Sequence, residues 1–448
     1  MEFKSVEDLK AALGGVVCDE GGGCKVEDAG ALGAEVIERL AFNAAVNKDE
    51  EIRDLARCVV KSAAAALGIY SASIQGLYEA MGRGEVTGLT VPAINIRGLT
   101  YDTARAVFRA GARNNSSAFI FEIAKSEIGY TAQRPAEYTA SILAAAIREG
   151  YKGPVFIQGD HFQVNAKNYE ADKAAEIEAL KALIKEAIEG EFYNIDIDAS
   201  TLVDLGRPTV MDQQRPNFEI TAFMTSYIRE LEPEGVTVSI GGEIGEVGSQ
   251  NSTEEELRAF MDGYLDLVAG RHKGISKISV QTGTSHGGVV LPDGTIAKVS
   301  VDFDTIERLS KVAREAYGLS GVVQHGASTL PDDAFHLFRE KEASEVHLAT
   351  GFQNMVYDSA SFPAALKDEI YSYLKENMKG EWGEGVTEEQ FLYKTRKKAF
   401  GPFKEKMWRL PEETRDAIGG ELEDRFDYLF RQLNSVDTLE TVKKYAGE

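Results

Sequence analysis

Residues 155–161 read Val-Phe-Ile-Gln-Gly-Asp-His, a short apolar run that ends in a glycine and two polar side chains. Short apolar runs bounded by glycine are typical of strands that are buried on both faces of a parallel sheet. The same pattern recurs along the chain, and it predicts eight strands. They cover residues 91–95, 118–123, 155–158, 194–198, 237–241, 278–282, 321–324 and 345–348.

Helical periodicity fills the intervals between these strands. The clearest amphipathic segments cover residues 102–114, 135–149, 171–189, 254–269, 304–317 and 331–339. Eight strands that alternate with helices predict a protein of the α/β class, specifically an eight-fold (β/α) barrel, or TIM barrel. A doubly wound open sheet is the main alternative, but no Gly-x-Gly-x-x-Gly turn marks one.

The segments outside this alternating region are helical in pattern. We therefore predict an N-terminal helical extension over residues 1–88, the barrel over residues 89–360 and a C-terminal helical arm over residues 361–448. The arm carries a basic island at residues 394–398. Within the barrel, the hydroxyl and acidic residues 252–256 are expected to cap and begin a helix.

The chain of 448 residues is strongly acidic, with a formal net charge of −23. Such a surface repels nucleic acid, and an anionic substrate needs local positive charge to bind to it. No apolar run approaches the roughly 20 residues that span a bilayer, and three cysteines without a regular framework fit a reducing compartment. We expect a cytoplasmic protein that binds neither nucleic acid nor membranes.

Three of the six histidines follow predicted strands. They are His161 in Gly-Asp-His, His286 in Gly-Thr-Ser-His-Gly and His325 in Gln-His-Gly-Ala-Ser. A (β/α) barrel gathers the carboxyl ends of its strands at one face, and neutral imidazole is the commonest ligand of catalytic zinc. We therefore predict a metal site held by these three histidines, with Asp160 beside it as the acid/base group.

Other polar residues fall at the same predicted face. Glu243 is interpreted either as a further metal ligand or as a group that orients a metal-bound histidine. A buried, unpaired carboxylate is costly, so we assign Asp198 to the site as well. His347 is interpreted as a substrate contact in preference to a fourth ligand. Small-residue loops that suit phosphate oxygens contain Gly287, Gly326 and Ser328.

Together these motifs resemble the class II, zinc-dependent ketose-bisphosphate aldolases, the family of fructose- and tagatose-bisphosphate aldolases. The resemblance runs from about Thr90 to Ser359 and is weaker in the arm, while residues 1–88 have no counterpart. It implies reversible cleavage of a ketose (bis)phosphate, first of all fructose 1,6-bisphosphate, to dihydroxyacetone phosphate and an aldehyde, as in glycolysis. It also implies Zn²⁺ or another divalent metal, allows a monovalent cation, and suggests a homodimer or larger homo-oligomer.

The resemblance gives roles to individual residues of this chain. Asp160 matches the catalytic acid/base that takes the C4 hydroxyl proton, and His161, His286 and His325 match the three zinc ligands. Glu243 matches a glutamate near the metal. The substrate-binding positions that we expect are Asn95, Lys125, Asp198, Gly287, Gly326, Ser328, His347 and Thr350.

Several positions depart from the family pattern. The acidic residue of the family's mobile loop is missing at Gln250-Asn251, and His347 replaces an asparagine that touches substrate. Phe403 replaces the arginine that holds the second phosphate, with Lys398 or Lys404 as candidate substitutes. The departures leave three functions open: an aldolase for this or another sugar phosphate, an isomerase or epimerase on the same scaffold, and a non-catalytic sugar-phosphate-binding subunit.

Overall fold

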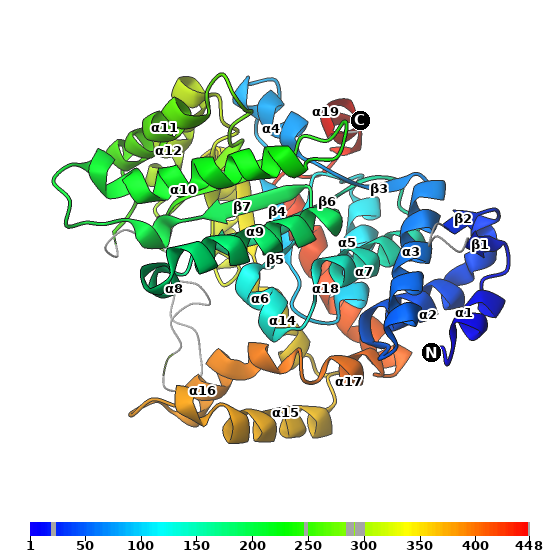
Figure 1. The fold of residues 1–448 in the computed structure, drawn as a ribbon. Helices are drawn as coiled ribbons and strands as arrows, with labels where there is room; N and C mark the ends of the chain where they lie inside the picture. Colours follow the sequence, from blue (N-terminus) through cyan, green and yellow to red (C-terminus); the bar gives the residue numbers. More distant parts are fainter. Residues whose placement is uncertain (19–23, 246–249, 284–290, 292–300, 447–448) are drawn as a thin grey trace.

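The structure, a computed structural model, describes residues 1–18, 24–245, 250–283, 291 and 301–446. Its centre is a closed barrel of eight parallel strands surrounded by helices (Figure 1). The strands follow one another in chain order around the barrel, and the last pairs with the first. They are β4 (Val91–Asn95), β5 (Ile120–Ala124), β6 (Gly153–Gln163), β7 (Asn194–Asp198), β8 (Ser239–Gly245), β9 (Lys277–Val280), β10 (Val322–Gln324) and β11 (Glu345–Leu348). The predicted (β/α) barrel is confirmed.

Helices follow the strands around the barrel, and all of them except α8 have buried side chains. They are α5 (Thr100–Arg113), α6 (Lys125–Tyr130), α7 (Pro135–Arg148), α8 (Ala166–Ala171), α9 (Lys173–Glu189), α10 (Val210–Leu231), α11 (Glu254–Val268), α12 (Phe303–Tyr317), α13 (His336–Glu340) and α14 (Thr350–Asp358). The expected cap of α11 is present, because Thr253 and Glu256 satisfy each other's backbone N–H groups.

The first 88 residues contain both helices and strands. The helices are α1 (Val6–Ala12), α2 (Gly33–Val46), α3 (Glu50–Ala66) and α4 (Gln75–Gly82), of which α2 and α3 pack against α7. A short antiparallel pair, β1 (Val16–Cys18) and β2 (Cys24–Val26), lies beside them. The purely helical expectation also missed β3 (Ile69–Ala72), which pairs with the first residues of β6. Four residues are too few to show a strand period in the sequence.

The C-terminal segment, residues 361–446, packs against both ends of the barrel. It comprises α15 (Ala364–Asn377), α16 (Glu388–Thr395), α17 (Lys404–Trp408), α18 (Glu412–Gln432) and α19 (Leu439–Ala446). Figure 1 shows α15 and α16 at the opposite end of the molecule from α4 and α19. Helix α18 packs along α5, where Arg415 bonds to Asp102 of the barrel and Glu38 of α2. None of the helices in the described ranges is long and apolar enough to cross a membrane.

Candidate active site

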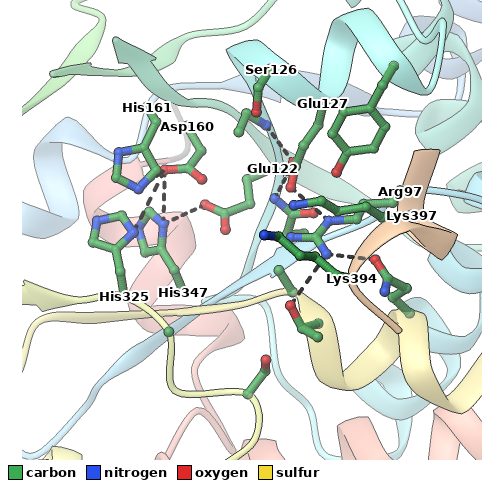
Figure 2. Close-up of a pocket in the computed structure, with 18 of the residues that line it drawn as sticks. Arg97, Glu122, Ser126, Glu127, Asp160, His161, His325, His347, Lys394 and Lys397 are labelled. Atoms are coloured by element: carbon green, nitrogen blue, oxygen red, sulfur yellow. Dashed lines mark hydrogen bonds and ion pairs between the residues drawn. The ribbon is translucent and has the colours of Figure 1, made fainter. Parts of the chain in front are cut away.

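Two of the predicted metal ligands, His161 and His325, face each other across the barrel mouth with ring centroids 4.3 Å apart (Figure 2). The Nδ1 atom of His161 lies 3.1 Å from Asp198 and 3.0 Å from Glu243, and its Nε2 atom lies on the side of Asp160. A carboxylate at one ring nitrogen fixes the imidazole and leaves the other nitrogen for a metal ion. Asp198 and Glu243 therefore orient His161.

His325 is held in the corresponding way. Its Nε2 atom lies 3.0 Å from the Ser279 hydroxyl, and its Nδ1 atom lies 4.0 Å from Oδ1 of Asp160. The His161, His325 and Asp160 donor atoms all lie within 4.8 Å of one another. Oδ1 of Asp160 is buried and has no hydrogen-bond partner among the described residues. Two imidazole nitrogens and one carboxylate oxygen form a donor set that fits Zn²⁺ or a similar divalent ion. His286 and Gly287 lie outside the described residues.

An irregularity in β6 brings Asp160 and His161 to the same side of the strand. The strand runs from Gly153 to Gln163, beyond the predicted residues 155–158, and its pairing with β7 shifts register between Gly159 and Phe162. His161 adopts a positive φ of 42° within this bulge. Successive side chains of a regular strand point to opposite faces, so the bulge lets both groups reach the barrel mouth.

Asp198→Asn is expected to weaken metal binding by about 10- to 100-fold, because the amide orients His161 less firmly than the carboxylate does. Competition against a chromophoric chelator measures the affinity. Asp204→Asn, in the exposed loop that follows the same strand, is the matched control. Equal affinity in both variants and the parent protein would show that Asp198 does not support the metal site.

His347 on β11 lies against this pair. Its ring centroid is 4.1 Å from that of His325, and its Nδ1 atom lies 3.0 Å from Glu122 and 3.3 Å from Asp160. Burial raises the pKa of Glu122 well above its usual value. Burial also acts on Asp160, but the charges of His161 and His347 hold the pKa of Asp160 well below its usual value. The lowered pKa of Asp160 favours its ionised form, which is the form that can act as a base.

A buried network of charges lies beneath these residues, deeper in the barrel. The Lys277 ammonium on β9 donates to Gln158 at 2.7 Å, to Asp196 at 3.0 Å and to Glu345. Glu345 also accepts from the Tyr78 hydroxyl of α4 and contacts His347. No role was expected of Lys277 or Glu345 from the sequence. Each is a charged residue that begins a short strand, which gives no sign in the sequence of a contact inside the barrel.

A cavity of about 570 Å³ leads from the histidines to a cationic end (Figure 2). Arg97, two residues beyond Asn95, lies at this end and donates to Glu127 and to Gln353, each at 2.7 Å. Lys394 and Lys397 of the arm line the same end. Burial, together with the nearby charge of Arg97, lowers the pKa of Lys397. The cavity thus supplies the local positive charge that an anionic substrate needs in this acidic protein.

The structure brings most of the remaining predicted residues to this cavity. Asn95, Gly326, Ser328, His347 and Thr350 line it. Asn95 donates to Glu127, and Ser328 accepts from the backbone of Gly351.

Three predicted lysines do not line the cavity. Lys125 begins α6, and its ammonium bonds to the Gln163 carbonyl and to Glu176. Lys404 pairs with Glu137 and Lys398 with Glu381. Arg97, Lys394 and Lys397 line the cavity instead, and no function was expected of these three residues from the sequence.

Comparison with known proteins is consistent with this site. The family model "Fructose-bisphosphate aldolase class-II" matches residues 77–416, and no curated protein matches the chain. A structure described as a probable tagatose 6 phosphate kinase from Sinorhizobium meliloti 1021 has a TM-score of 0.52 at 17% identity, covering 80% of this chain and 90% of that chain. This likeness supports the fold alone.

Two further solved structures are more distant. The fructose-bisphosphate aldolase from Campylobacter jejuni has a TM-score of 0.49 at 16% identity, covering 83% of this chain and 97% of that chain. The YdjI aldolase from Escherichia coli K12 has a TM-score of 0.48 at 12% identity, covering 82% of this chain and 98% of that chain.

Proposed function

Because this chain belongs to the class II fructose-bisphosphate aldolase family, we propose that it is a divalent-metal-dependent aldolase that cleaves fructose 1,6-bisphosphate or a closely similar ketose bisphosphate. The observation that carries the proposal is the placing of Asp160 beside His161 and His325 at one end of a cavity whose other end is cationic. Such a cavity suits a substrate with reacting atoms near the metal and an anionic group at its far end.

His161 and His325 hold the ion, which supplies Lewis-acid chemistry toward the substrate carbonyl when bound. Asp160 accepts the proton of the C4 hydroxyl, and the C3–C4 bond breaks as the C4–O bond becomes the aldehyde carbonyl. The electron pair of the broken bond passes to C3 and the C2 oxygen, and C3 then takes up a proton to give dihydroxyacetone phosphate. In the reverse direction Asp160 returns that proton to the new C4 hydroxyl. The loop at Gly326 and Ser328 binds one phosphate, and Arg97 with the arm lysines binds the other.

The test is release of dihydroxyacetone phosphate from fructose 1,6-bisphosphate, coupled to a reductase and started by adding Zn²⁺ to metal-depleted protein. We expect release that depends on the metal and is lost in His325→Ala. It should persist in His336→Ala, the matched variant on the outer helix α13. Conversion to another ketose phosphate without cleavage would favour an isomerase or epimerase. Binding without turnover would favour a sugar-phosphate-binding subunit.

Lys397→Ala is expected to raise KM for fructose 1,6-bisphosphate by about 10- to 100-fold, the effect of losing one charge-assisted hydrogen bond. KM for fructose 1-phosphate, which has no distal phosphate, should change little. Steady-state kinetics with both substrates makes the comparison. Lys398→Ala is the matched control, because this neighbouring ammonium pairs with Glu381. A similar rise for both substrates would show that Lys397 does not contact the distal phosphate.

A further inference from the structure

Glu122, Asp160 and His347, which we call the inner cluster, form a second group of potential metal ligands. The three residues come from β5, β6 and β11, and each side chain is buried. The Nδ1 atom of His347 lies 3.0 Å from a Glu122 oxygen and 3.3 Å from Oδ1 of Asp160. Atoms bound at about 2.1 Å to one ion are roughly 3.0–3.4 Å apart. The inner cluster therefore has the spacing of a ligand set.

One polar atom of each residue in the inner cluster lacks a hydrogen bond. The Glu122 oxygen nearest His347 is Oε2, which accepts from Gln158 at 3.0 Å, whereas Oε1 of Glu122, Oδ1 of Asp160 and Nδ1 of His347 are buried without a hydrogen-bond partner among the described residues. The distances from Nδ1 to the two carboxylate oxygens are those of ion pairs. Buried polar atoms are otherwise almost always partnered. A shared central cation would satisfy all three residues at once.

The balance of charge points the same way. Six carboxylates meet in this part of the barrel, and their cationic partners among the described residues are the Lys277 ammonium and the imidazole rings of His161, His325 and His347. The carboxylates are Glu122, Asp160, Asp196, Asp198, Glu243 and Glu345. One divalent ion at His161 and His325 offsets only part of this charge. Burying unbalanced carboxylates is costly, and a second divalent ion reduces the imbalance further.

We propose that Glu122, Asp160 and His347 bind a second divalent metal ion, and that Oδ1 of Asp160 bridges it to the ion held by His161 and His325. The inference rests on the proposed function in one respect, because it assumes that an ion is bound by His161 and His325. Two carboxylates and one imidazole suit Mn²⁺, Fe²⁺, Co²⁺ or Zn²⁺. The contacts of Asp160 with His161, His325 and His347 all use Oδ1, so its second carboxylate oxygen stays available for the substrate.

Metal stoichiometry tests this proposal. Metal-depleted protein is titrated with Co²⁺, and bound metal is measured by equilibrium dialysis and by the visible absorption of the ion. We expect two equivalents in the parent protein and one in Glu122→Gln. His347→Asn should likewise bind one, which keeps the test valid if Glu122→Gln does not fold. Glu137→Gln should bind two, because this buried carboxylate pairs with Lys404 outside the barrel.

Two results would overturn the proposal. One is a single equivalent in the parent protein. The other is a second equivalent that survives Glu122→Gln and His347→Asn but is lost in Glu243→Gln, which would place the ion beside His161 instead. The measurement needs no substrate, so it separates the two hypotheses. An inactive protein with two equivalents would contradict the aldolase, and an active protein with one would contradict the second ion.

Discussion

Asp160→Asn is expected to lower kcat for cleavage of fructose 1,6-bisphosphate by about 10³-fold, within the usual range for loss of a general acid/base. The amide keeps the shape of the side chain but does not accept the C4 hydroxyl proton. No other carboxylate among the described residues contacts all three histidines of the site. Steady-state release of dihydroxyacetone phosphate at saturating metal measures the effect.

The control for this experiment separates chemistry from metal binding. Metal content is measured on the same samples, and kcat is compared at a metal concentration that fills the site in both proteins. Asp204→Asn, an exposed carboxylate in the loop after β7, should retain the parent kcat. If Asp160→Asn lowered kcat less than 10-fold with its metal bound, another group would have to be the base.

Lys277→Met is expected to lower the free energy of unfolding by about 3–5 kcal/mol, the usual effect of removing one partner from a buried ion pair. The Lys277 side chain is 1% exposed, and its loss leaves Asp196 and Glu345 buried without their cation. Denaturation in urea measures the change. Lys273→Met, which removes a half-exposed ammonium paired with Glu79, should change stability by less than about 1 kcal/mol.

A double variant shows whether the charges themselves are responsible. Adding Glu345→Gln to Lys277→Met removes the charge of one of the two carboxylates that have lost their ammonium partner. The double variant should therefore be more stable than Lys277→Met alone. If the second substitution made the protein less stable still, lost packing around Lys277 would explain the effect better than unpaired charge.

The fold and half of the site could be predicted from the sequence because both depend on local patterns. Short apolar runs separated by amphipathic helices identify the barrel strands. The residues that directly follow such runs, among them Asp160, His161 and His325, meet at one face of any parallel barrel. This geometric rule requires no knowledge of which strands are neighbours.

The rest depends on contacts between distant segments. His347 and Glu122 meet because β11 and β5 both flank β4, and the direction of each side chain depends on inter-strand register. The bulge at His161 gives no signal in an apolar pattern. Lys397 enters the cavity only because the arm folds back over the barrel mouth, whereas Lys125, closer to the site in sequence, turns toward α9.

The return of the arm to the barrel mouth also sets an order of maturation during synthesis. The barrel strands end with β11, so the metal-binding end of the cavity can assemble once that strand has left the ribosome. Lys394 and Lys397 follow later, and with them most of the cationic end. Under the proposed function, a nascent chain therefore becomes able to take up metal before it can recognise a ketose bisphosphate.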